Sequence, residues 1–117
     1  ISGLVGSEMC IRDSSLCGDE MQIELILKNE KILDFGYQGK SCVYCQASAS
    51  LLSKISINNQ KEKINDLCDK AELYFNDDVK IIDKKWNSLK KLIKKKNINK
   101  KDCILLPFKT LKKIVSN

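Results

Sequence analysis

The chain of 117 residues contains no histidine, which excludes histidine-based acid–base catalysis and every metal site with an imidazole ligand. Arginine occurs once, at Arg12, so side chains that read DNA bases through paired hydrogen bonds are scarce. No apolar run approaches the roughly 18 residues that a membrane span needs. The start of the chain also lacks the basic and then apolar pattern of a signal peptide, so we expect a cytoplasmic protein that contacts no membrane.

Lysine supplies 20 of the 21 basic residues and gives the chain a formal net charge of +6. The lysines concentrate in the second half, as in Lys94–Lys96, Lys100 and Lys101. Such a charge can serve nucleic-acid binding or an acidic partner, but no known nucleic-acid-binding motif accompanies it here. We therefore interpret the lysines as a solvated helix face and expect no nucleic-acid partner.

Cysteine is abundant, with six residues in the chain. Without an export signal, metal or sulfur chemistry explains so many cysteines better than disulfide bonds do. Because histidine is missing, any metal has to be held by thiolates and carboxylates, and this favours zinc or iron–sulfur chemistry.

Residues 1–13 read ISGLVGSEMCIRD and follow neither the strand period nor the helix period. The stretch VGSEMCIRD resembles the translation product of sequencing-adapter DNA. We therefore expect residues 1–14 to be a non-native or disordered segment without function or stable core contacts, and we discount Cys10 and Arg12. Residues 15–117 should then form one domain.

Two alternating stretches, 19–28 and 32–37, predict an antiparallel hairpin. Apolar residues then recur at helical spacing in four stretches: 44–57, 61–75, 79–95 and 105–115. A polar break separates the last two, and Pro107 would be tolerated only in the first turn of the final helix. Strands followed by helices predict an α+β domain in which helices pack on a small antiparallel sheet.

Three cysteines lie where loops meet predicted elements. Cys17 precedes the first strand, whereas Cys42 and Cys103 each precede a helix. The partial positive charge of a helix N-terminus stabilises a thiolate, the form that binds metal and attacks sulfur. If the three thiolates converge, Asp19, two residues after Cys17, would complete a four-ligand tetrahedral site.

Cys45 and Cys68 permit other interpretations. Cys68 falls on the apolar face of its helix, so we predict that it is a small core residue. Cys42 and Cys45 form a CxxC pair at a helix start, and a thioredoxin-like oxidoreductase that uses this pair is one alternative function. The intervening Val43 and Tyr44 and the lack of strand–helix alternation argue against it. A zinc-stabilised interaction module is the other alternative.

Three motifs in order resemble the NifU N-terminal/IscU/SufU family of iron–sulfur cluster assembly proteins. They are LCGD at 16–19, GKSC at 39–42 followed by ASASLL at 47–52, and Cys103 with LPFKTL at 106–111. The separation of 61 residues between Cys42 and Cys103 resembles that of the SufU branch. Asp102 stands where IscU has a histidine, and this also favours the SufU branch. The chain departs from the family at Ser41, Cys45 and Ser14-Ser15, and we expect it to lack the family's N-terminal helix.

The resemblance implies a SufU/IscU-like α+β fold and a site composed of Cys17, Asp19, Cys42 and Cys103. This site would bind Zn²⁺, as in SufU-like proteins, or a [2Fe–2S] cluster, as in IscU-like proteins. Cys17 would accept persulfide sulfur from a SufS-like cysteine desulfurase, and downstream iron–sulfur assembly or client proteins would receive the product. Such a protein is not an enzyme by itself, because the desulfurase cleaves the carbon–sulfur bond.

Overall fold

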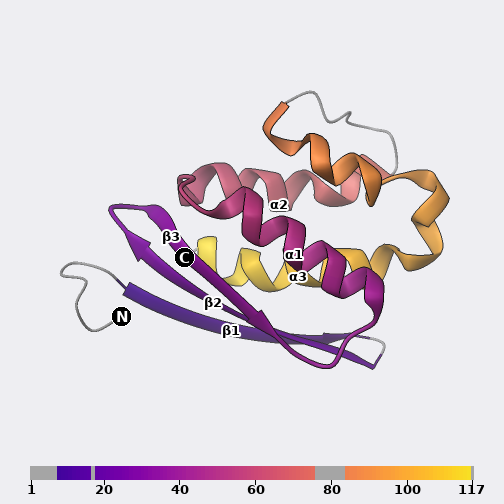
Figure 1. The fold of residues 1–117 in the computed structure, drawn as a ribbon, viewed down its shortest axis with the longest axis horizontal. Coiled ribbons are helices and arrows are strands. Elements are labelled where there is room, and N and C mark those ends of the chain that lie inside the picture. The colour runs from indigo at the N-terminus through magenta and orange to yellow at the C-terminus, as the bar shows by residue number, and fades with distance from the viewer. Residues whose placement is uncertain (1–7, 17, 76–83, 117) are drawn as a thin grey trace.

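The computed structural model describes residues 8–16, 18–75 and 84–116, which form a three-stranded sheet packed by helices (Figure 1). The strands β1 (Glu8–Leu16), β2 (Asp19–Lys28) and β3 (Lys31–Gln38) are antiparallel and lie in the order β1-β2-β3. The elements that follow are α1 (Val43–Ser56), α2 (Lys61–Phe75), the 3₁₀ helices η1 (Lys84–Lys91) and η2 (Lys95–Lys100), and α3 (Lys101–Val115). The predicted α+β class is confirmed.

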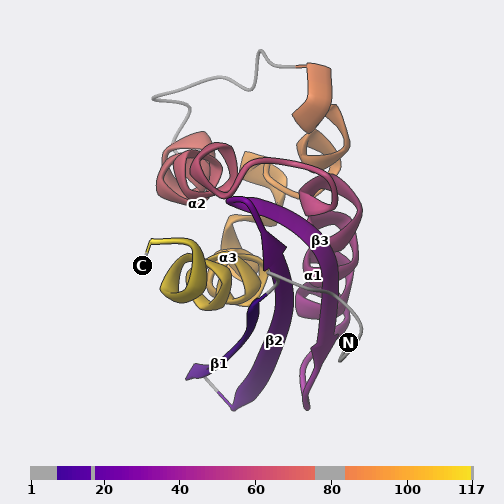
Figure 2. The same ribbon diagram turned by 90° about the vertical axis from the view of Figure 1, so that its left-hand side faces the viewer.

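The β2–β3 hairpin follows the predicted alternation. Met21, Ile23 and Leu25 on β2 are buried, whereas Glu24 between them is exposed. The chain reverses at Asn29 and Glu30, whose positive φ angles of 53° and 65° suit a two-residue hairpin turn. α3 packs against β1 and β2, α1 packs against β3, and α2 packs on α3 (Figure 2). α1 and α3 therefore cover the apolar face of the sheet, and α2 packs outside them on α3.

The N-terminal segment differs from its expected disorder. Glu8–Leu16 forms the edge strand β1, paired with β2 from Glu8 opposite Leu27 to Leu16 opposite Asp19. The expectation of disorder is therefore wrong for residues 8–14, while residues 1–7 lie outside the described residues. The physical reason is that the edge of β2 offers a row of unpaired backbone N–H and C=O groups, so a segment without a clear side-chain period can still pair with it. Cys10 also packs against the core, and the non-native origin of the segment stays a prediction.

The helix predicted for 79–95 also differs. Residues 79–83 lie outside the described residues, and the rest of the stretch contains the 3₁₀ helix η1 and the start of η2. The apolar stripe itself was correctly identified, because Trp86, Leu89 and Ile93 are buried. A 3₁₀ helix places residues i and i+3 on the same side, so Trp86 and Leu89 can be buried together without an α-helix.

α3 begins at Lys101, earlier than the predicted start near Leu105, and two expectations change with it. Cys103 is the third residue of the helix rather than a residue before it, and Pro107 lies in the helix interior rather than in the first turn. Proline has no N–H, so the carbonyl of Cys103 loses its partner within the helix. Burial of the apolar face offsets this loss; its residues include Ile104, Leu106, Phe108 and Leu111.

The segment after β3 lies against the start of β2. The backbone N–H of Glu20 donates to the carbonyl of Lys40 at 2.7 Å. Gly39 has a φ of +150°, and a Cβ built on it would lie 2.1 Å from the carbonyl oxygen of Glu20. Only glycine allows the two backbones to approach this closely. Within the described part of the chain, no helix has the length and apolar character needed to cross a membrane.

Gly39→Ala should reduce the free energy of unfolding by at least about 1–3 kcal/mol, because alanine would both adopt an unfavourable φ and displace the backbone of Glu20. Denaturant unfolding measures the change. Gly36→Ala is the matched control, since a Cβ at Gly36 would be 3.9 Å from the nearest atom, an ordinary contact with Glu24 Oε2. Equal stability of the two variants would show that the close approach is not required.

Candidate metal centre

Three of the four predicted ligands come together in the structure. Asp19 begins β2, Cys42 is the N-cap residue of α1 and Cys103 lies in the first turn of α3. One carboxylate oxygen of Asp19 and the two sulfur atoms all lie within 4.8 Å of one another, and all three residues are partly buried. Cys17, the fourth predicted ligand, lies outside the described residues.

The Asp19 carboxylate connects the sheet to α1. Its Oδ1 atom accepts a hydrogen bond from the backbone N–H of Cys42 at 3.2 Å. Its Oδ2 atom is buried and has no hydrogen-bond partner among the described residues. A buried carboxylate oxygen without a partner is unfavourable, and coordination to a cation would compensate it. The carboxylate thus fits a metal ligand that would coordinate through Oδ2 while the hydrogen bond to Oδ1 holds it in place.

The electrostatics of Cys103 also fit a cation. Burial, followed by hydrogen bonds with Cys42 and Asp19 and by their charges, raises the pKa of its thiol to about 12. Without a cation, the Cys103 thiol therefore stays protonated at neutral pH. A cation among the three donors would favour the thiolate and release a proton on binding. Sulfur donors with one carboxylate suit zinc or iron rather than calcium or magnesium, which prefer oxygen ligands.

The first turn of α1 forms one rim of this cluster. The carbonyl of Cys42 accepts a hydrogen bond from the backbone N–H of Gln46 at 3.0 Å, so the partially positive N-terminus of α1 lies at the ligand residue itself. Lys100 Nζ lies 5.9 Å from the centre of the Tyr44 ring, a cation–π contact that joins α1 to η2.

Comparison with known proteins identifies the family. The NifU-like N terminal domain matches residues 5–73, more than half of the chain. The chain belongs to this family. The family includes the IscU and SufU iron–sulfur cluster assembly scaffolds, and the resemblance inferred from the three motifs is confirmed. An iron–sulfur cluster assembly scaffold protein IscU from Thermotoga maritima is 38% identical over 56 residues, which cover 48% of this chain and 39% of that protein.

Solved structures show the same NifU-like fold. The N-terminal part of a NifU-like protein from Brucella abortus superposes with a TM-score of 0.79 at 15% identity, covering 92% of this chain and 76% of that one. A putative iron–sulfur cluster assembly scaffold protein for the SUF system from Fervidobacterium islandicum has a TM-score of 0.70 at 28% identity, covering 86% and 76%. The second structure agrees with the predicted similarity to the SufU type.

Cys45, the unusual cysteine of this NifU-like chain, is fully buried in the core and is not among the three clustered ligand residues. Burial raises the pKa of its thiol, a hydrogen bond with Ser41 lowers it, and the charges of Asp19 and Cys42 raise it. A buried, protonated thiol is unlike the accessible partner that a redox CxxC pair needs. Cys68 packs against the core as predicted, and burial raises the pKa of its thiol to about 12.

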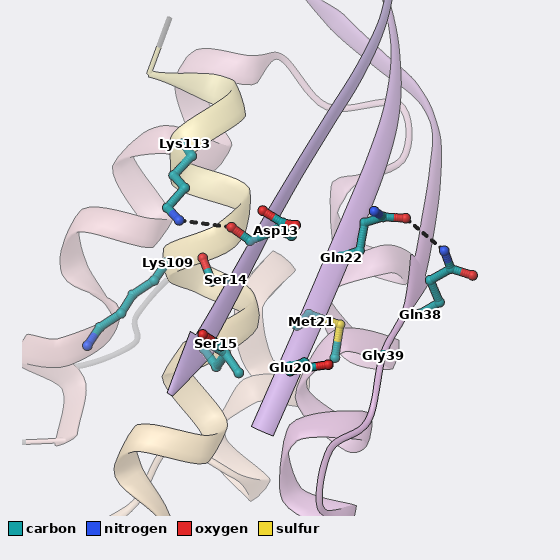
Figure 3. A pocket seen from close by; sticks show the side chains of 11 residues that line it. Asp13, Ser14, Ser15, Glu20, Met21, Gln22, Gln38, Gly39, Lys109 and Lys113 are labelled. Atoms are coloured by element: carbon teal, nitrogen blue, oxygen red, sulfur yellow. Dashed lines mark hydrogen bonds between the residues drawn. The ribbon is translucent and has the colours of Figure 1, made fainter. Parts of the chain in front are cut away.

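A cavity of about 870 Å³ between the sheet and α3 was not predicted from the sequence, because β1 was not expected (Figure 3). Its lining is mixed polar and apolar, and comprises Asp13, Ser14, Ser15, Glu20, Met21, Gln22, Gln38, Gly39, Leu106, Lys109 and Lys113. Glu20 follows the ligand Asp19 directly, and Leu106 is three residues after Cys103. Lys113 Nζ donates to the carbonyl of Asp13 at 2.9 Å and ties α3 to β1.

We expect one zinc ion per chain, with Cys42→Ser and Cys103→Ser each losing most of it. These variants should also melt at lower temperature, because structural zinc contributes on the order of 10 kcal/mol to folding in small domains. Asp19→Ala should retain part of the metal, since three thiolates and a water can still hold zinc. Metal analysis and thermal melting of protein purified without oxygen measure both effects.

Cys68→Ser is the control, because it removes a thiol that packs outside the cluster. Cys45→Ser should keep the metal for the same reason. If Cys103→Ser kept full metal while Cys45→Ser lost it, the metal would be held locally by Cys42 and Cys45, and the three-segment site would be wrong.

Proposed function

We propose that this NifU-like chain is a metal-holding sulfur acceptor in iron–sulfur cluster assembly, with Cys17, Asp19, Cys42 and Cys103 as its site. The cluster of Asp19, Cys42 and Cys103 is the observation that carries the proposal. Cys17 is two residues before Asp19, so their Cα atoms are at most about 7 Å apart. This closeness along the chain supports the proposal that Cys17 is the fourth ligand.

The native occupant of the site is proposed to be zinc. Three thiolates and one carboxylate would complete a tetrahedral zinc site. The 28% identity to a SUF-system scaffold supports the SufU-like form of the site, for which zinc is the expected metal. Alternatively, the same ligands would assemble a [2Fe–2S] cluster as a product, as in IscU-like proteins. The colour of the purified protein separates the two, since a zinc protein is colourless and a cluster protein is brown.

The proposed reaction moves one sulfur atom between proteins. The Cys17 thiolate attacks the outer sulfur of a persulfide on the cysteine of a desulfurase. A new sulfur–sulfur bond forms on Cys17 as the old one breaks, and the desulfurase cysteine leaves as a thiolate, so no net oxidation occurs. Bound zinc would lower the pKa of the acceptor thiol and protect it from stray oxidation. The carbon–sulfur cleavage belongs to the desulfurase, so the chain itself is proposed to be an acceptor and not an enzyme.

The rim of the site supports a protein partner. Val43, directly after Cys42, is 81% exposed, so an apolar side chain faces solvent beside the ligands. Lys100 and Lys40 add positive charge near the same segment and are both exposed. A cysteine desulfurase with a complementary surface is the partner we propose, and downstream assembly or client proteins would receive the sulfur or the cluster.

Two alternatives from other classes predict different behaviour. A thioredoxin-like oxidoreductase would reduce disulfides through Cys42 and Cys45, but Cys45 is fully buried and the sheet is antiparallel throughout β1–β3. A zinc-stabilised interaction module would hold metal through the same ligands without any response to a desulfurase. The response of a desulfurase therefore distinguishes the proposal from both.

Cys17→Ser should abolish stimulation of a SufS-like cysteine desulfurase, because serine cannot accept sulfane sulfur. Alanine and sulfide production by the desulfurase, measured with and without the purified chain, reports the stimulation. Cys68→Ser should retain it, apart from some loss of packing stability, and is the matched cysteine-to-serine control. Full stimulation by the Cys17 variant would exclude Cys17 as the acceptor.

A further inference from the structure

Ser48 makes a buried hydrogen bond between two helices that carry metal ligands. Its hydroxyl donates to the carbonyl of Ile104 at 2.6 Å, and the side chain is fully buried. Ser48 belongs to α1, whose N-cap residue is Cys42, and Ile104 directly follows Cys103 in α3. The bond therefore joins the two helices one residue away from a ligand.

The sequence of α3 makes this contact more important than an ordinary side-chain bond. Pro107 has no N–H, so the carbonyl of Cys103 cannot accept the hydrogen bond that would normally fix this turn to the rest of the helix. The turn that carries Cys103 is consequently held less firmly by its own helix. Ser48 supplies an anchor from outside, at the next carbonyl along the chain.

The apposed surface of α1 allows the short serine side chain to reach α3. The fully buried face of α1 includes Cys45, Ser48, Ala49 and Leu52, of which the first three are small. Small residues let two helix backbones approach closely. The hydrogen bond from the Ser48 hydroxyl forms only within a narrow range of distances, so it restricts the separation of α1 and α3. Cys42 and Cys103 both lie at the N-terminal ends of these two helices, so the separation of the helices bears directly on the distance between them.

We propose that Ser48 is a positioning residue of the metal site: its buried hydroxyl holds the Cys103 turn of α3 against α1 and so sets the spacing between the Cys42 and Cys103 sulfurs. The metal-binding part of this inference rests on the proposed function. The spacing of the two sulfurs is a property of the folded chain and can be tested without metal.

The chain contains two matched controls. Ser56 is also in α1 and fully buried, but its hydroxyl has no hydrogen-bond partner among the described residues. Thr110 is fully buried in α3 and donates to the carbonyl of Leu106 at 2.8 Å, within its own helix. Ser56→Ala controls for the loss of a buried hydroxyl from α1. Thr110→Val controls for the loss of a buried hydrogen bond to an α3 carbonyl and for the stability that goes with it.

The first measurement is the affinity for Co²⁺, a spectroscopic substitute for zinc. Binding is monitored by the thiolate-to-cobalt absorption and by the visible bands of a tetrahedral site. Ser48→Ala should weaken Co²⁺ binding by about 10- to 100-fold, the usual effect of removing a group that orients a ligand, and should change the visible bands. Ser56→Ala and Thr110→Val should leave both unchanged, although Thr110→Val should lower the melting temperature.

The second measurement needs no metal. In a Cys45→Ser background, the fraction of Cys42–Cys103 disulfide in a glutathione redox buffer, quantified by peptide mapping, reports how often the two sulfurs meet. Ser48→Ala should shift this equilibrium away from its wild-type value, whereas Ser56→Ala should not. If the parent chain binds no cobalt, the proposed function fails, and the disulfide equilibrium still decides the role of Ser48. If Ser48→Ala matches Ser56→Ala in the disulfide equilibrium, the positioning role is wrong.

Discussion

The hydrogen bond from the backbone N–H of Cys42 to the carboxylate of Asp19 joins the sheet to the first helix at the point where the site forms. It depends on the close approach of Gly39 and Lys40 to Glu20, which no residue with a Cβ at position 39 would allow. Once Asp19 is fixed in this way, its second oxygen points into a buried position without a partner in the described structure. Two sulfurs then lie close enough to share a cation with it.

The same arrangement explains the chemistry proposed for the chain. Burial, together with the nearby Cys42 and Asp19, raises the pKa of Cys103, so the metal-free cluster keeps a proton that a bound cation would displace. Binding is therefore expected to weaken as pH falls, since each thiol has to ionise before it can coordinate. Asp19 is the weakest ligand of the proposed set, and an incoming persulfide would compete most easily for its place.

Much of this structure follows from local sequence patterns, and the exceptions have physical causes. Alternation and helical spacing predicted β2, β3, α1 and α2, because these elements bury one regular face. β1 was missed because an edge strand gains its stability from backbone pairing, which leaves little side-chain signal. The start of α3 was misplaced because burial of the apolar face outweighs the bond lost at Pro107.

Periodicity alone could not show that Asp19, Cys42 and Cys103 meet, because they are distant in sequence; the family resemblance suggested it, and the fold brings these three together. X-ray absorption at the zinc edge of the loaded protein tests the four-residue site most directly. The four-residue site predicts a first shell of three sulfurs at about 2.3 Å and one oxygen at about 2.0–2.2 Å. A shell of four sulfurs, or one dominated by oxygen or nitrogen, would contradict it.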